Sequence, residues 1–270
     1  MFDISFEDPA KPGSKEKAYA YQNSWGITTR TIGVMIMIHG DDKGLVLPPR
    51  ATQVQTIIVP CGATKTEEEA KAIRDRINEI NDCLNNAGIK SKADLRDQYR
   101  PGWKFNHWEQ KGVPIRIEIG PKDVQSGGCV LARRVDGEKI TVNHVSMDNG
   151  AFQKLIKNQL NQIHDQMYAK AQADLDSHLR FADNWADFIS ALNDGCLVQV
   201  PFSGEIADED EIKRRSAEDT GGEAKEAGAP SMGAKSLCIP FDPLRKLEPG
   251  MKCIISGKPA TQITMFGRSY

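Results

Sequence analysis

Two short stretches of this sequence combine side chains that can bind nucleotides. The first, residues 23–30, reads Asn-Ser-Trp-Gly-Ile-Thr-Thr-Arg and places a glycine, two threonine hydroxyls and Arg30 between apolar segments. A guanidinium in such a setting can bind a phosphate or stack on a nucleobase. A β-turn with a surface arginine fits the same residues. The pattern alone leaves both interpretations open.

The second stretch, residues 101–112, reads Pro-Gly-Trp-Lys-Phe-Asn-His-Trp-Glu-Gln-Lys-Gly and runs on into Arg116, Glu118 and Lys122. Aromatic rings stack on unpaired RNA bases, lysine and arginine bind phosphates and guanine edges, and a carboxylate accepts from a base amino group. These residues therefore fit a single-stranded RNA site. The alternative is a loop whose tryptophans fill the core.

Motifs of several common enzyme classes are missing from the sequence. It contains no P-loop, no G-x-G-x-x-G, no nucleophile elbow and no H-E-x-x-H. His39 and His107 are isolated from other ligand or triad candidates, so we interpret both as structural. The acidic run at 208–211 is interpreted as a solvated surface.

Composition predicts a soluble globular chain of two or three domains. The 270 residues include 35 Lys and Arg and 37 Asp and Glu, a net charge of −2, so any nucleic-acid surface must be a local patch. The longest apolar run, residues 32–38, is too short to span a membrane, and the N-terminus lacks the features of a signal peptide. Six cysteines without a C-x-x-C pair favour reduced thiols in the cytosol.

Apolar periodicity predicts the elements that must position these stretches. A hairpin is expected at residues 1–23. The β-branched content of 31–38 favours a buried strand, although periodicity does not separate that from a buried helix. From residue 54 to 167 the order strand, helix, strand, strand, strand, helix predicts a compact α/β domain. Its first helix has a capping box at Thr66 and Glu69, and the Asp136-Gly137 pair predicts a hairpin.

The last hundred residues predict a small α+β domain. A short helix is expected at 185–192 and a strand at 196–202, followed by a loop or solvated helix over 203–235. Short strands are expected at 237–240, 252–255 and 262–266.

Four segments, in this order, resemble the C-terminal part of prolyl-tRNA synthetases of the eukaryotic and archaeal type, which are class II aminoacyl-tRNA synthetases. The segments are residues 23–33, 101–120, 231–235 (Ser-Met-Gly-Ala-Lys) and 266–270 (Phe-Gly-Arg-Ser-Tyr).

The resemblance implies an α/β chain in three parts. Residues 1–49 would be the end of the antiparallel catalytic sheet with the third class II motif, whose helix replaces the strand expected at 31–38. Residues 50–170 would be the anticodon-binding domain, with a mixed five-stranded sheet, and residues 171–270 a small α+β C-terminal domain.

The implied activity is proline–tRNA ligation, in which ATP activates L-proline for transfer to tRNA(Pro). The chemistry rests on positioning and charge stabilisation. The resemblance implies that the full enzyme uses ATP and Mg²⁺. It also implies a homodimer located in the cytoplasm without a membrane partner, and it leaves membership in a multi-synthetase complex open. It places Arg30 against ATP as the catalytic residue. Around the ATP and proline pocket it places Trp25, Gly26, Thr28 and Thr29, and near the active site it places Tyr270.

In the anticodon-binding domain the resemblance leaves open which side chains touch bases. The candidates to read the two guanines of proline anticodons are Lys104, Glu109, Arg116, Glu118 and Lys122. The rival interpretation is a non-catalytic RNA-binding module that reuses this fold, which the stretch at 23–30 argues against. The first two class II motifs are absent, so we expect a C-terminal fragment that cannot activate proline alone.

Zinc-containing members of this family have cysteines at positions matching Ser203, Ala207, Cys253 and Ile255. Only Cys253 is retained, so no metal is predicted. The C-terminal domain would then depend on its apolar side chains and buried thiols, which we expect to be Ile206, Leu237, Ile239, Ile254, Phe266, Cys196 and Cys238.

Overall fold

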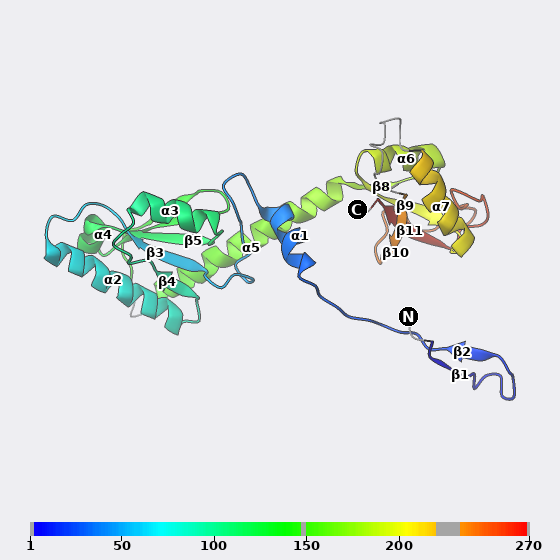
Figure 1. The fold of residues 1–270 in the computed structure, drawn as a ribbon, viewed down its shortest axis with the longest axis horizontal. Helices are drawn as coiled ribbons and strands as arrows, with labels where there is room; N and C mark the ends of the chain where they lie inside the picture. Colours follow the sequence, from blue (N-terminus) through cyan, green and yellow to red (C-terminus); the bar gives the residue numbers. More distant parts are fainter. Residues whose placement is uncertain (1–2, 147–149, 220–232, 269–270) are drawn as a thin grey trace. The chain divides into compact units, whose positions relative to one another are not determined.

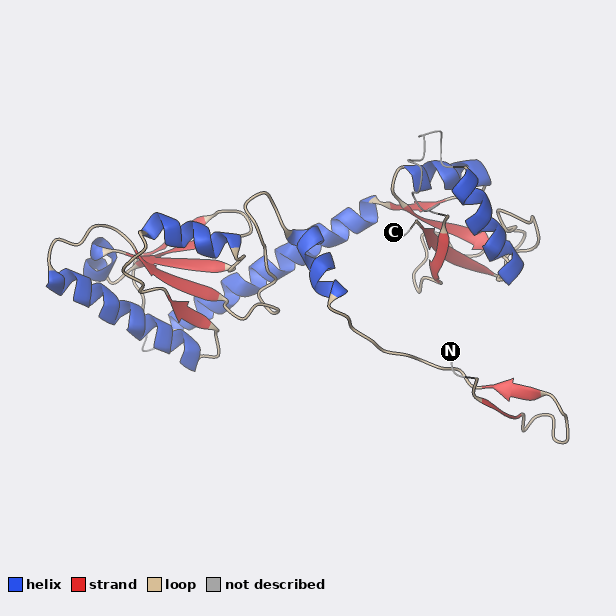
Figure 2. Cartoon of the chain, viewed as in Figure 1, coloured by secondary structure: helices blue, strands red, loops and turns tan. Residues whose placement is uncertain are grey.

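The computed structural model describes residues 3–146, 150–219 and 233–268, and the chain forms two compact units, Met1–Met167 and Tyr168–Tyr270. Each unit combines helices with a sheet (Figures 1 and 2), so the predicted mixed α/β class is confirmed. Within the described residues, no helix is long and apolar enough to cross a bilayer.

The first unit begins with the predicted hairpin, in which β1 (Ser5–Glu7) pairs antiparallel with β2 (Lys17–Tyr19). The strand predicted from β-branched content at 31–38 is wrong, because α1 (Arg30–His39) occupies this segment. Valine and isoleucine lower helix propensity by only a few tenths of a kcal/mol (about 0.5), so composition does not decide such a segment. None of the residues of α1 is buried.

A five-stranded mixed sheet forms the centre of the first unit, as predicted. The first two strand pairings along the chain are parallel, so each needs a crossover connection. The last two pairings are antiparallel and form a meander. In sheet order the strands are β4 (Ser91–Ala93), β3 (Thr56–Pro60), β5 (Ile115–Ile119), β6 (Cys129–Arg133) and β7 (Lys139–Val142).

The start of the first crossover helix follows the predicted capping pattern. Thr66 Oγ1 accepts the Glu69 N–H at 3.2 Å, and Glu69 Oε2 accepts the Lys65 N–H at 2.8 Å. Gly88, just after the helix, has a φ of 78°. After α1, the described helices of this unit are α2 (Glu67–Asn86), α3 (Pro101–Gln110), α4 (Pro121–Ser126) and α5 (Ala151–Ser177), the last of which continues into the second unit.

The two faces of the sheet are covered differently, because side chains alternate along each strand. Ile58 and Ile117 pair across β3 and β5 and belong to the core that includes α2 and α5. Ile57 points to the other face, where α3 packs through Trp108. Arg116 pairs with Ile57 and therefore lies on this second face, so the sheet and α3 position the polar residues of β5.

Among the described residues, the second unit has a four-stranded sheet, two helices that lie wholly within it, and a core centred on Phe188, Phe202 and Phe266. In sheet order its strands are β10 (Lys235–Cys238), β11 (Gln262–Gly267), β9 (Leu197–Phe202) and β8 (Leu179–Phe181), and its helices are α6 (Trp185–Asn193) and α7 (Ile206–Glu218).

Several expectations for the second unit are wrong. Lys252 forms only an isolated bridge with Pro259 rather than a strand over 252–255. The helix α7 is not fully solvated, since Ile212 is buried in the core. Among the predicted core residues, Phe266 and Cys196 are buried and Ile254 packs against the core, whereas Ile206, Leu237, Ile239 and Cys238 are exposed. An apolar side chain does not by itself reveal whether another element covers it.

Candidate functional site

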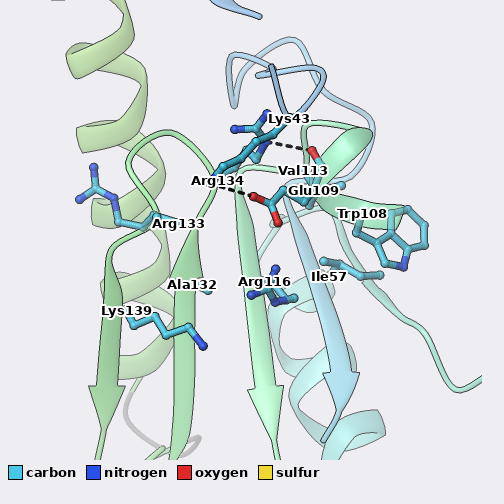
Figure 3. Close-up of a pocket in the computed structure, with 11 residues that line it drawn as sticks. Lys43, Ile57, Trp108, Glu109, Val113, Arg116, Ala132, Arg133, Arg134 and Lys139 are labelled. Carbon is cyan, nitrogen blue, oxygen red and sulfur yellow. Dashed lines mark hydrogen bonds and ion pairs between the residues drawn. The ribbon is translucent and has the colours of Figure 1, made fainter. Parts of the chain in front are cut away.

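A pocket of about 180 Å³ lies on the α3 side of the first sheet, and we call it the Arg116 pocket (Figure 3). Its floor follows the strand register, because Arg116 pairs with Ala132 and Ala132 pairs with Lys139. The helix α3 contributes Trp108 and Glu109 at one side. The full lining is Lys43, Ile57, Trp108, Glu109, Val113, Arg116, Ala132, Arg133, Arg134, Gly137 and Lys139.

Arg116 is held in place by a carboxylate and an aromatic ring. Its Nε and Nη2 donate to Glu118 Oε1 at 3.0 and 2.8 Å, while Lys139 Nζ lies 3.3 Å from Glu118 Oε2. The guanidinium also lies 4.2 Å from the centroid of the Phe105 ring. Two cations thus share one carboxylate, which leaves hydrogen-bond donors available to a ligand that enters the pocket.

A second arginine fixes the wall of the pocket. Arg134 donates to both Asp41 oxygens at 2.8 and 2.6 Å and to the Glu109 carbonyl at 2.9 Å. The hydrogen bond from Arg134 lowers the pKa of Asp41 to about 2, against a smaller opposing effect of burial. Lys43 Nζ lies 3.6 Å from Glu109 Oε1. The turn after α1 is therefore tied to the β6–β7 hairpin and brings another cation to the pocket.

Of the five anticodon-domain candidates, Arg116 and Glu109 line the pocket and Glu118 supports Arg116. Lys104 is different: it is only 3% exposed, and its Nζ donates to the Asp94 carbonyl at 3.1 Å. Desolvation lowers the pKa of Lys104, so its role here is structural. Lys122 is exposed in the first turn of α4 and does not line the Arg116 pocket.

The candidates at residues 25–30 are not assembled into an enclosed site. Trp25 is 95% exposed, and Gly26, Thr28, Thr29 and Arg30 are also exposed. Arg30 is the first residue of α1. Tyr270 in the fourth of the resembling segments, and residues 231 and 232 in the third, lie outside the described residues.

Sequence reasoning missed several residues of the Arg116 pocket. Lys139 follows the predicted hairpin turn, and its alternation with apolar neighbours could have placed it beside Arg116. Lys43 and Arg134 carried no comparable signal, because Arg134 and its partner Asp41 are 93 positions apart in the chain.

A separate polar cluster ties α7 to two loops of the second unit. Asp208 is 7% exposed, and its Oδ2 accepts from Ser203 Oγ and Ser256 Oγ, each at 2.6 Å. The hydrogen bond from Ser203, followed by that from Ser256, lowers the pKa of Asp208, and a bond with Cys253 adds to the effect. The interpretation of 208–211 as wholly solvated is therefore wrong at Asp208, whose carboxylate is the acceptor at the centre of this cluster.

These residues do not fit a zinc site. Only Cys253 supplies a thiol, the two serine hydroxyls donate to Asp208, and structural zinc requires four strong ligands. Two positions implied by the resemblance, Ser203 and Cys253, lie in the cluster, but Asp208 and Ser256 complete it instead of Ala207 and Ile255. Within the described ranges, no group of three or more His, Cys, Asp or Glu side chains could hold a metal.

Comparison with known proteins assigns both units. A family model described as "Anticodon binding domain" matches residues 55–154, which include the Arg116 pocket floor. A second, described as "Prolyl-tRNA synthetase, C-terminal", matches residues 185–270.

Similar proteins match over the whole of this chain. A bifunctional glutamate/proline–tRNA ligase of Mus musculus is 50% identical, with 17% of its length covered. A putative proline–tRNA ligase of Saccharomyces cerevisiae is 43% identical with 39% covered, and a cytoplasmic proline–tRNA ligase of Arabidopsis thaliana is 39% identical with 47% covered. The chain thus spans less than half the length of each of these relatives.

Proposed function

Because the chain belongs to the prolyl-tRNA synthetase family, as a C-terminal portion, we propose that it supplies the anticodon-reading part of a proline–tRNA ligase. The observation that carries this proposal is the Arg116 pocket, in which donors and carboxylates gather on the open part of a sheet face. The pocket lies in the segment that matches the anticodon-binding family.

The side chains of the pocket suit a guanine base. Guanine presents O6 and N7 as acceptors, which an arginine or lysine can meet, and its amino group can donate to a carboxylate. Arg116 and Lys139 supply the donors, and Glu109, whose side chain is 32% exposed, supplies the acceptor at the rim. Glu118 is less exposed and orients both cations. Phe105 supports the Arg116 guanidinium from the side of α3.

The proposal is tested by measuring binding of this chain to a proline anticodon stem-loop by fluorescence anisotropy. We expect binding to weaken when both anticodon guanines are replaced by adenines, because adenine offers a donor where guanine offers O6. Equal affinity for the two stem-loops would contradict the placement of the anticodon in the Arg116 pocket.

The whole enzyme would use ATP and Mg²⁺ to activate L-proline and would transfer it to tRNA(Pro). Within the enzyme, Arg30 would contact ATP, and Trp25, Gly26, Thr28 and Thr29 would border the ATP and proline pocket. Tyr270 would lie near this active site. We place the enzyme in the cytoplasm as a homodimer. The name of the mouse relative, which couples glutamate and proline ligation, supports a complex with other synthetases.

We expect this chain alone to produce no prolyl-adenylate. The proposed ATP-contacting residues are exposed, so they do not form the water-excluding environment in which charge stabilisation is strong. The measurement is ATP–pyrophosphate exchange with proline. Exchange above background, lost in Arg30→Ala, would show that residues 25–30 already suffice and would contradict this prediction.

A further inference from the structure

A second pocket, of about 200 Å³, lies beyond Trp108 and is distinct from the Arg116 pocket. We call it the Lys92 pocket. It combines Lys92 of β4, Arg96 of the following loop, and His107 and Lys111 from α3 and its end. Trp108 lines both pockets, so the two are neighbours at this residue.

The charge of the Lys92 pocket is not neutralised from within. Its one lining carboxylate, Asp94, already accepts from Arg96 Nε and Nη2 at 2.8 and 2.7 Å and from Trp108 Nε1 at 2.7 Å. Lys92 and Lys111 place their ammonium groups 5.6 and 5.1 Å from the Trp108 ring centroid. Across the part of the chain that the structure describes, neither ammonium lies within ion-pair distance of a carboxylate.

We propose that the Lys92 pocket binds a backbone phosphate of the RNA whose base occupies the Arg116 pocket. This inference rests on the proposed anticodon function and adds a second contact to it. Phosphate contacts supply a large share of the affinity of nucleic-acid-binding proteins without reading the sequence, and lysine binds phosphate as a point charge. Because the two pockets share Trp108, a strand whose base enters the Arg116 pocket brings its backbone close to the Lys92 pocket.

A phosphate contact and a base contact have different consequences for binding. Removing a phosphate contact weakens the binding of all RNA sequences equally and reduces its salt dependence. Removing a base contact instead reduces the discrimination between sequences. The double variant Lys92→Gln/Lys111→Gln is therefore expected to bind the proline stem-loop and its adenine-substituted form about tenfold more weakly each. The magnitude of the slope of log K against log salt should fall by about 0.7, the value for one phosphate that is no longer neutralised.

The experiment compares this variant with two controls in fluorescence anisotropy at several salt concentrations. Lys92→Arg/Lys111→Arg keeps both charges and should bind like the parent chain. Lys154→Gln/Lys157→Gln removes two exposed charges from α5, which packs on the opposite face of the sheet, and should change neither affinity nor slope.

Three results would overturn the inference. An unchanged salt slope in the glutamine variant shows that no phosphate contact was lost, and a loss confined to the proline stem-loop shows that the lysines read a base. Saturable binding of inorganic phosphate, measured by tryptophan fluorescence, that does not compete with the stem-loop assigns the pocket to a free anion. Failure of the anticodon proposal is recognised separately, because the parent chain would then not distinguish the two stem-loops.

Discussion

Replacing Arg116 by alanine is expected to weaken binding of the proline anticodon stem-loop by about 1–3 kcal/mol, or roughly 5- to 150-fold. Arg116 is a firmly oriented donor of the pocket, because Glu118 and the Phe105 ring fix its guanidinium. The same variant should lose much less affinity for the adenine-substituted stem-loop, since adenine cannot accept a hydrogen bond at the position of guanine O6. Anisotropy with both RNAs gives the two affinities directly.

Two further variants separate base reading from general electrostatics. Glu118→Gln removes the charge that orients Arg116 and Lys139 and should give an intermediate loss of discrimination. Arg74→Ala removes an exposed charge from α2, on the other face of the sheet, and should bind like the parent. If Arg116→Ala weakened both stem-loops equally, Arg116 would be a phosphate contact and the assignment of the pocket would be wrong.

The fold was predictable from sequence where local signals specify it. The capping box at Thr66 and the alternation of isoleucine with polar residues in β5 depend on residues within a few positions of each other. The same alternation placed Arg116 and Glu118 on one face, so this part of the site was also predictable. The helix α1 was not predictable from its composition, because its β-branched residues fit either element.

The remaining features depend on contacts between residues far apart in the chain. Lys104 looks like a surface cation in an RNA-binding segment, yet it turns inward, where its Nζ donates a hydrogen bond to the Asp94 carbonyl at 3.1 Å. Asp41 and Arg134 meet only because the turn after α1 returns to the β6–β7 hairpin. Asp208 likewise differs from its acidic neighbours only through Ser203 and Ser256. No local pattern distinguishes these residues from solvated ones.

The Asp208 cluster leads to the second large effect that we expect. Asp208→Ala should lower the free energy of unfolding by about 3 kcal/mol, because it removes charge-assisted hydrogen bonds and leaves the buried Ser203 hydroxyl without its acceptor. Asp208→Asn keeps the shape but not the charge and should cost about half as much. The control Asp210→Asn changes an exposed member of the same acidic run and should have little effect.

The pH dependence of these variants identifies the ionised carboxylate as the source of stability. The pKa of Asp208 is lowered in the folded chain, so the unfolded chain binds its proton more readily. The stabilisation is complete above the unfolded pKa, about 3.9, and is lost as the pH falls through the lower folded value. The difference in unfolding free energy between the parent and Asp208→Asn should therefore be constant above about pH 5 and shrink below about pH 4. Urea unfolding at a series of pH values measures it.

The same cluster predicts that the second unit folds without zinc. Its polar groups already satisfy one another, and Cys253 is the sole thiol among them. A chelator should leave the thermal midpoint unchanged, and mass spectrometry of the purified chain should find no stoichiometric metal. Near-stoichiometric zinc, or a midpoint that falls with chelator, would contradict this prediction. A chelator-insensitive midpoint that falls in Asp208→Ala would instead show that a buried carboxylate, rather than a metal, joins α7 to the loops around it.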